Sequence, residues 1–314
     1  MQTVEYGIVP VHINIDERTE KMREFVIMTD SDTEIPYTFA EQHNVPVFLM
    51  PYTLNGEESL FDLGKTTDYA GFYQALRDGA DAATSTRSTY DIQCFYEEIL
   101  KEGKDILYVC FSSQLSSHYD LAHLAKDAAL ENYPEAKIEI VDTLGIAMGA
   151  GLLVYHAVRL KEEGKSMEEI IAWLIENRMR SLHYFSVDSL TQLRKGGRVS
   201  AVTATLGTML DLKPILTLNR EGKIVAFDKV KGRKKVVKYL ADMVEKNYVD
   251  DDICKELIVV MHADNEAQAK SLQEAIAGKA KFKNIWFMDV GPVIGSHCGP
   301  GVMAVLMMGK EREL

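Results

Sequence analysis

Along the first half of the chain, short apolar runs alternate with polar turns and with segments whose apolar residues recur at helical spacing. The apolar runs are too short for helices and are rich in strand-forming residues, which predicts strands at 25–28, 45–54, 106–111 and 137–141. Helical spacing predicts helices at 31–43, 68–77, 88–99, 121–128, 146–163 and 166–178. The order strand, polar turn, helix, strand is typical of a parallel sheet, so this half is predicted to be an α/β unit.

Local polar patterns refine these boundaries. Ser31 with Glu34 and Ser166 with Glu169 have the spacing of capping boxes, in which a serine and an acidic residue satisfy each other's backbone N–H groups. Helices are therefore expected to begin at both places. Residues 55–65 are predicted to be a loop.

The pattern changes near residue 182. Strands are predicted at 184–187, 213–218, 223–230, 256–262, 285–290 and 302–308, with helices at 233–246 and 265–277. The turn 219–222 between two of these strands is a hairpin signal, so the second sheet is expected to be mixed. The chain is thus divided into an extension (1–24), an N-terminal α/β domain (25–182) and a C-terminal α/β domain (183–314). The alternating extension suits either an edge strand or an arm that packs on a partner.

Composition narrows the class of protein. The chain has 314 residues, enough for two domains, and a formal net charge of −12, which disfavours general binding to nucleic acid. Four scattered cysteines without a C-x-x-C motif predict neither a disulfide framework nor a metal site. No apolar run approaches the roughly 20 residues of a membrane span, and the start of the chain lacks the layout of a signal peptide. A cytoplasmic protein is expected.

Three polar turns are the candidates for ligand binding: 84–89, 112–117 and 295–301. The second follows a strand, precedes a helix and contains Ser112, Ser113, Ser116 and Ser117. Side-chain hydroxyls and free backbone N–H groups at the carboxyl end of a strand favour an anion. The competing interpretation is that these serines only cap the helix.

Other residues add candidate chemistry without completing a catalytic set. His297 lies among glycines and suits a base, a ligand hydrogen-bonder or a packed side chain. Arg194, Lys195 and Arg198 bracket a Gly-Gly pair, and a basic run extends from Lys229 to Lys238. That run suits a solvated helix face, a partner contact or transient membrane contact. The sequences of a nucleophile elbow, of a dinucleotide fingerprint and of a Walker A loop are not present.

With these residues laid out, the sequence resembles the DegV family of bacterial fatty-acid-binding proteins from about Phe25 to its end. The resemblance rests on six motifs in order: 29–31 (Thr-Asp-Ser), 84–85 (Thr-Ser), 112–116 (Ser-Ser-Gln-Leu-Ser), 193–200, 213–216 (Lys-Pro-Ile-Leu) and 297–301 (His-Cys-Gly-Pro-Gly). Two departures concern the head-group turns. Ser116-Ser117-His118 stands where the family usually has Ser-Gly-Thr, and Thr86-Arg87 stands where it often has Gln-Pro.

The resemblance implies a two-domain α/β protein that holds one long-chain fatty acid between its domains. Family members act as the non-catalytic, acyl-carrying subunit of a fatty acid kinase. A separate ATP-binding subunit, related to dihydroxyacetone kinases, phosphorylates the bound carboxylate, and the acyl phosphate feeds phospholipid metabolism. By this resemblance the carboxylate is bound at Thr84, Ser85, Ser116 and Ser117 with His297 close by, and Arg198 faces the kinase subunit or the transferred phosphate. No cofactor or metal is expected.

Two other functions suit the same residues. In one, the hydroxyl-rich turns bind a phosphorylated ligand such as a sugar phosphate. In the other, Ser116 or Ser113 acts with His297 as a lipid esterase, since such a pair is defined by geometry and not by sequence order.

Overall fold

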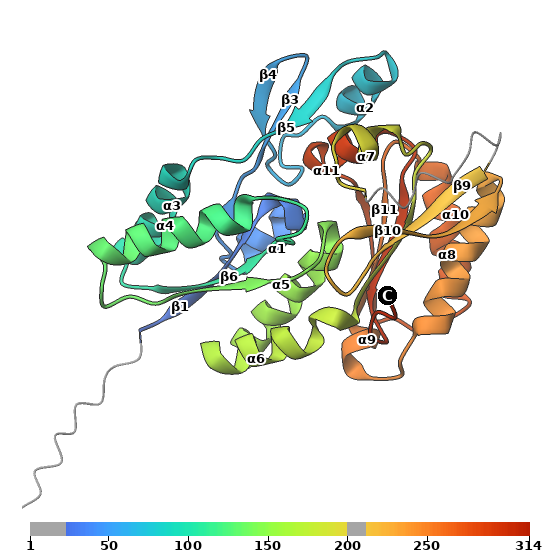
Figure 1. Cartoon of the computed structure of the whole chain (residues 1–314). Helices are drawn as coiled ribbons and strands as arrows, with labels where there is room; N and C mark the ends of the chain where they lie inside the picture. The colour runs from blue at the N-terminus through green and yellow to red at the C-terminus, as the bar shows by residue number, and fades with distance from the viewer. Residues whose placement is uncertain (1–22, 200–211) are drawn as a thin grey trace, which may run out of the picture.

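The computed structural model describes residues 23–199 and 212–314 (Figure 1). The predicted extension therefore lies almost wholly outside the described residues. The first sheet has the order β2-β1-β6-β7 and is parallel throughout. Its strands are β1 (Phe25–Asp30), β2 (Val47–Phe48), β6 (Asp105–Cys110) and β7 (Ile138–Asp142). The predicted parallel sheet is confirmed.

Helices cover both faces of this parallel sheet. Figure 1 shows α3 (Thr89–Lys101) and α4 (His118–Asn132) on one side, and α5 (Ala147–Glu162) with α6 (Met167–Asn177) on the other. The capping boxes of α3 and α6 form, at Ser88 with Asp91 and at Ser166 with Glu169. Each box satisfies two backbone N–H groups at the start of its helix.

The box predicted at Ser31 and Glu34 does not form. Asp30 caps a short 3₁₀ turn, η1 (Ser31–Thr33), and Glu34 has the left-handed backbone with φ of 55°. Helix α1 (Tyr37–Gln42) begins only after Pro36. The Glu34 carboxylate accepts the N–H of the distant Gly291 at 2.6 Å, so a tertiary contact replaces the local one.

A small antiparallel sheet was missed by the sequence patterns. The strand predicted at 45–54 divides into β2 and β3 (Pro51–Leu54), and the loop predicted at 55–65 contains β4 (Glu57–Leu60). Asn55 and Gly56 turn between β3 and β4 with φ of 52° and 84°, the positive values that an Asn-Gly hairpin turn requires. The third strand, β5 (Ala82–Thr84), ends at Thr84, and α2 (Tyr69–Arg77) lies between β4 and β5.

The second sheet is mixed and has the order β10-β9-β8-β13-β11-β12. Among its described strands, β11 and β12 are parallel neighbours and the other neighbouring pairs are antiparallel. The strands are β8 (Ser181–Ser186), β9 (Leu212–Leu218), β10 (Ile224–Lys231), β11 (Leu257–His262), β12 (Asn284–Asp289) and β13 (Met303–Met308). The predicted domain boundary at 182 falls inside β8, and the division into domains stays a prediction.

One face of the mixed sheet packs against α8 (Arg233–Asn247) and α10 (Glu266–Ala277), as Figure 1 shows. The other face contacts α5, which also contacts the parallel sheet. A single hydrophobic cluster therefore runs from the first sheet to the second. In the part of the chain that the structure describes, the other short helices are η2 (Arg178–Arg180), α7 (Thr191–Lys195), α9 (Asp252–Glu256) and α11 (Pro292–Cys298).

Helix α11 corrects another expectation, because 295–301 was predicted to be a polar turn. Pro292 occupies the start of the helix, and Gly299 follows its end with φ of 72°. Proline at the first turn and glycine after the last is a helix signature that the high glycine content concealed. As a result, His297 is held on a buried helix instead of a loop.

Candidate ligand-binding site

All six residues predicted from the sequence line one cavity of about 210 Å³. It lies where β5, the turn before α4, the end of α7 and helix α11 meet. The cavity thus joins segments from both halves of the chain. Its polar lining comprises Asp32, Thr84, Ser85, Thr86, Ser116, Ser117, Arg198 and His297.

Thr84 and His297 are in direct contact. The Thr84 hydroxyl lies 2.8 Å from Nε2 of His297, which joins the small sheet to α11. Burial lowers the pKa of His297 to about 4, and the nearby Arg198 guanidinium acts in the same direction. The imidazole is therefore neutral near pH 7, where it offers one N–H donor and one acceptor.

Close packing fixes the other side of the imidazole ring. A Cβ built on Gly196 would lie 2.4 Å from Nδ1 of His297, so the backbone at the end of α7 approaches the ring where no side chain fits. Gly196, the first glycine of the basic motif, thus has a structural role beside the histidine.

The four serines of the central turn have different environments. Ser116 is half-buried, lines the cavity and accepts the N–H of His118 at 3.2 Å. Ser117 is exposed at the cavity and makes no side-chain cap bond to α4. Ser112 is buried and donates to the carbonyl of Gly222 at 3.1 Å, in the turn between β9 and β10. Ser112 therefore links the two sheets, and Ser113 does not line the cavity.

The remaining predicted residues lie at the rim. Ser85 follows β5 and is exposed, whereas Arg198 is half-buried. Nε of Arg198 donates to the carbonyl of Leu115 at 3.2 Å, and Nη1 donates to that of Gly196 at 2.5 Å. These bonds hold the guanidinium beside the turn 112–117, which contains the four serines.

Asp32 is a lining residue that sequence reasoning missed. It is only 5% exposed, and its Oδ1 has no hydrogen-bond partner within residues 23–199 and 212–314. Burial raises the pKa of Asp32 well above its ordinary value, the Asp30 and Glu34 carboxylates add to the rise, and Arg198 opposes it. The sequence offered one signal, an acidic residue in the turn after β1, where ligands bind in open α/β sheets.

An apolar cavity of about 30 Å³ lies beyond the polar one. Its lining comes from the start of α5 and from β8, β11 and β13, and includes Phe185, Met261, Val302, Ala304 and Leu306. The two cavities share Ile146, Ile294 and Cys298 as a common wall. His183 also lines this second cavity, but the surface that it presents there is apolar, so a polar compartment and an apolar one adjoin in the space between the sheets.

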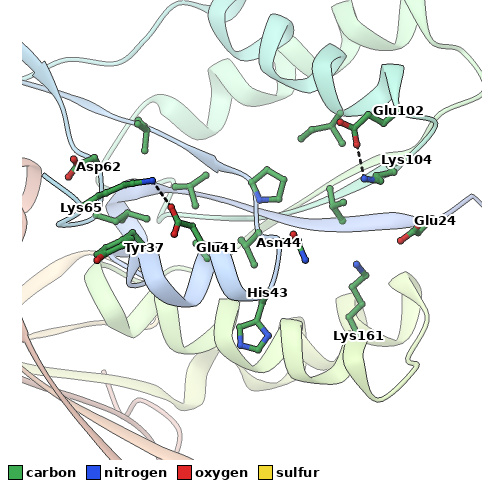
Figure 2. A pocket seen from close by; sticks show the side chains of 18 residues that line it. Glu24, Tyr37, Glu41, His43, Asn44, Asp62, Lys65, Glu102, Lys104 and Lys161 are labelled. Carbon is green, nitrogen blue, oxygen red and sulfur yellow. Dashed lines mark hydrogen bonds and ion pairs between the residues drawn. The ribbon is translucent and has the colours of Figure 1, made fainter.

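A larger cavity, of about 790 Å³, lies elsewhere, beside the edge of the parallel sheet (Figure 2). Its charged side chains are of both signs, and two of its lysines are paired, Lys65 with Glu41 and Lys104 with Glu102, each at 2.6 Å. Size alone does not make a binding site. None of the predicted site residues lies here, and the polar groups do not converge on one point.

Asp30, Cys110 and His118 bring atoms of metal-binding type within 4.8 Å of one another. Hydrogen bonds account for this cluster, because the Tyr108 hydroxyl donates to Asp30 at 2.8 Å and lies 2.7 Å from Nε2 of His118. Asp30 also accepts the N–H of Phe111. We assign the cluster to the core of the first sheet. The expectation that the protein uses no metal or cofactor stays a prediction.

The fold is that of an α/β protein with two large sheets and one small antiparallel sheet, and its candidate site is a cavity lined by segments from both halves of the chain. A model of the family described as "Uncharacterised protein, DegV family" matches residues 24–310. A DegV domain-containing protein of Clostridium perfringens is 38% identical over 292 residues, covering 93% of this chain and all of the relative. The chain belongs to the DegV family.

Solved structures agree with this assignment. A DegV family protein of Thermus thermophilus, described by its fatty acid binding, has a TM-score of 0.81 and 29% identity, with 92% of this chain and 100% of that chain covered. DegV of Bacillus subtilis, described as a fatty acid binding protein, has a TM-score of 0.78 and 26% identity at the same coverage. Within residues 23–199 and 212–314, no helix is long and apolar enough to cross a membrane.

Proposed function

We propose that this protein binds one long-chain fatty acid, with the carboxylate at Thr84, Ser116 and His297. The acyl chain would extend past the shared wall into the apolar cavity. The observation that carries the proposal is this adjacency of a hydroxyl-lined compartment and a wholly apolar one. A carboxylate held by hydroxyls and N–H groups needs no metal, because charge-assisted hydrogen bonds are strong.

The two cavities are small for a long-chain ligand, so side chains must move when it binds. Sites for drug-sized ligands usually measure about 300–1,000 Å³, whereas the polar cavity measures about 210 Å³ and the apolar one about 30 Å³. The side chains of Ile146, Ile294 and Cys298 must therefore move apart when a long chain enters. Burial of each CH₂ contributes about 0.8 kcal/mol, which offsets this rearrangement.

The proposal extends to a partner. Following the family resemblance, the bound acid is presented to a separate, dihydroxyacetone-kinase-like subunit that uses ATP to form the acyl phosphate. The product would enter phospholipid metabolism in the cytoplasm of a bacterium. In this arrangement the present chain is not itself the enzyme. Arg198 supports the proposal, since a half-buried guanidinium beside the serine turn suits a transferred phosphate.

The contacts do not favour the esterase alternative. Nε2 of His297 contacts the Thr84 hydroxyl, and the Ser116 hydroxyl accepts the N–H of His118. A serine nucleophile would need its hydroxyl within hydrogen-bond reach of the histidine. The apolar cavity likewise favours an acyl chain over a sugar phosphate.

The direct test is to denature protein purified from a bacterial host and to identify the extracted small molecules by mass spectrometry. About one equivalent of a long-chain fatty acid is expected. An empty extract, followed by no uptake of added fatty acid, would contradict the proposal. A phosphorylated polar metabolite would instead support the phospho-ligand function.

Ser116→Ala is expected to weaken fatty-acid binding, because it removes a hydroxyl that donates to the carboxylate. A hydrogen bond to a charged group contributes about 1.5–3 kcal/mol, so the dissociation constant should rise roughly 10- to 150-fold. Displacement of a fluorescent fatty acid measures this change. Ser113→Ala is the matched control, since Ser113 belongs to the same turn but does not line the cavity. Equal affinities of the two variants would remove Ser116 from the site.

A further inference from the structure

The polar cavity contains one carboxyl group that the proposed ligand contacts leave unused. Asp32 follows β1, lines the cavity and is 5% exposed. Its backbone N–H donates to Asp30 Oδ1 at 3.1 Å, which fixes the turn that carries it. Its own Oδ1 is buried and has no hydrogen-bond partner among the described residues. A buried polar atom without a partner is costly, so its presence beside a ligand cavity calls for an explanation.

The two neighbouring acids do not line the cavity. Asp30 accepts hydrogen bonds from the Tyr108 hydroxyl and from the N–H of Phe111. Glu34 Oε1 accepts the N–H of Gly291, whereas Glu34 Oε2 is buried without a partner among the described residues. Of these three acids, Asp32 is the one that both lines the cavity and has a buried oxygen without a partner.

The charges around Asp32 do not permit a second ionised carboxylate. Burial and then the Asp30 carboxylate disfavour its ionisation, Glu34 adds to this effect when it ionises above its own pKa of about 8, and Arg198 favours ionisation. His297 on α11 is neutral near pH 7, because burial lowers its pKa to about 4. A fatty-acid carboxylate in the cavity would be a further anion facing this one guanidinium. Two carboxyl groups at one buried site share a proton, because both cannot be ionised without large repulsion.

We propose that Asp32 shares one proton with the carboxylate of the bound fatty acid, and that Arg198 balances the single remaining negative charge. This inference rests on the proposed function, which places the carboxylate in this cavity. The shared proton turns an unpartnered acid into a hydrogen-bond donor to the ligand. When free Asp32 is ionised, ligand binding takes this proton from solvent. No covalent bond forms or breaks.

Two consequences follow for binding. Affinity for a fatty acid should fall as the pH rises above the pKa of free Asp32, by up to tenfold for each pH unit, because one proton is bound with the ligand. A fatty alcohol of equal length brings no charge, so its affinity should not show this decrease. Asp32 would thereby set the preference for an acid head group at low pH.

The experiment measures binding of dodecanoic acid and of dodecanol between pH 6 and pH 9.5. It compares the unchanged protein with Asp32→Asn, which keeps an N–H donor but cannot ionise. The unchanged protein should lose affinity for the acid over the part of this range that lies above the pKa of free Asp32, by up to tenfold for each pH unit, while Asp32→Asn should show a flat profile. Asp127→Asn is the matched control, because Asp127 is exposed on α4 and outside the cavity. It should retain the unchanged protein's profile.

Calorimetry of the unchanged protein in buffers of different ionisation enthalpy supplies a second measurement, which does not depend on the folding of a variant. Up to one proton should be taken up per dodecanoic acid at the alkaline end. Three results would overturn the proposed role of Asp32 without affecting the proposed function. They are the absence of proton uptake, equal pH profiles for the unchanged protein and Asp32→Asn, and tighter binding by Asp32→Asn at every pH. Failure of the unchanged protein to bind either ligand would instead overturn the proposed function.

Discussion

Ala304→Phe is expected to abolish the gain in affinity that longer fatty acids obtain over shorter ones. Ala304 lies on β13 opposite Phe185, and both residues line the apolar cavity of about 30 Å³. A phenyl ring at this position fills the space into which the end of a long acyl chain would extend. If four methylene groups are excluded, roughly 3 kcal/mol is lost at about 0.8 kcal/mol each, which is more than a hundredfold in affinity.

The measurement is a plot of affinity against chain length, from octanoic to octadecanoic acid. The unchanged protein should bind more tightly with each added methylene group, whereas Ala304→Phe should reach a plateau. Overpacking a core costs about 1–3 kcal/mol of stability wherever it occurs, so a control must share that cost. Ala241→Phe serves, because Ala241 is buried on α8 in the other hydrophobic cluster. If the plots for the two variants are parallel, the acyl chain does not occupy the cavity at β13.

Glu34→Gln is expected to make the protein more stable at alkaline pH. Glu34 is 2% exposed, and burial raises its pKa to about 8, although the N–H of Gly291 acts in the opposite direction. The folded state thus binds a proton that the unfolded state, with a pKa near 4.5, has released. The contribution of Glu34 to the free energy of unfolding should therefore be largest below about pH 4.5 and should decrease as the pH rises to about 8.

The full decrease is on the order of 5 kcal/mol, because the pKa of Glu34 rises from 4.5 to about 8 and one pKa unit corresponds to about 1.4 kcal/mol. Glutamine keeps an oxygen acceptor for the N–H of Gly291 and cannot ionise, so the variant should lack this part of the decrease. Urea unfolding at pH 5 and pH 9 measures the difference between the two proteins. Glu58→Gln on β4 is the control, because Glu58 is exposed and should leave the profile unchanged. A stability difference between Glu34→Gln and the unchanged protein that is the same at both pH values would refute this account.

The sequence predicted that the first sheet is parallel and that segments 84–89, 112–117 and 295–301 supply the candidate site, because both predictions depend on local patterns. The hairpin of β3 and β4 was also present in the sequence, in Asn55-Gly56, but β4 reads Glu-Glu-Ser-Leu and all four of its residues are exposed. A strand without a buried face lacks the alternation by which strands are recognised. Helix α11 was missed for a related reason, since glycine and proline within a helix resemble a turn.

The residues of the candidate site also differ in whether local sequence patterns could predict their positions. Ser112 and Ser116 are equivalent in the sequence pattern, yet one links the two sheets and the other lines the cavity. Only the position of Gly222, more than a hundred residues away, distinguishes them. Asp32 and Glu34 were read as part of a helix start because short-range capping rules apply to such spacings. Their burial comes from long-range packing, which local rules do not contain.

The contact between Thr84 and His297 connects segments separated by 213 residues, and both line the cavity that would hold the ligand. A molecule bound there contacts both halves of the fold at once, so it dissociates when the two halves separate on unfolding. Such a ligand stabilises the folded chain by mass action, by about 2.7 kcal/mol at a free concentration one hundred times its dissociation constant. The melting temperature would then report the lipid supply of the cell, and protein depleted of lipid should be the form that proteases degrade first.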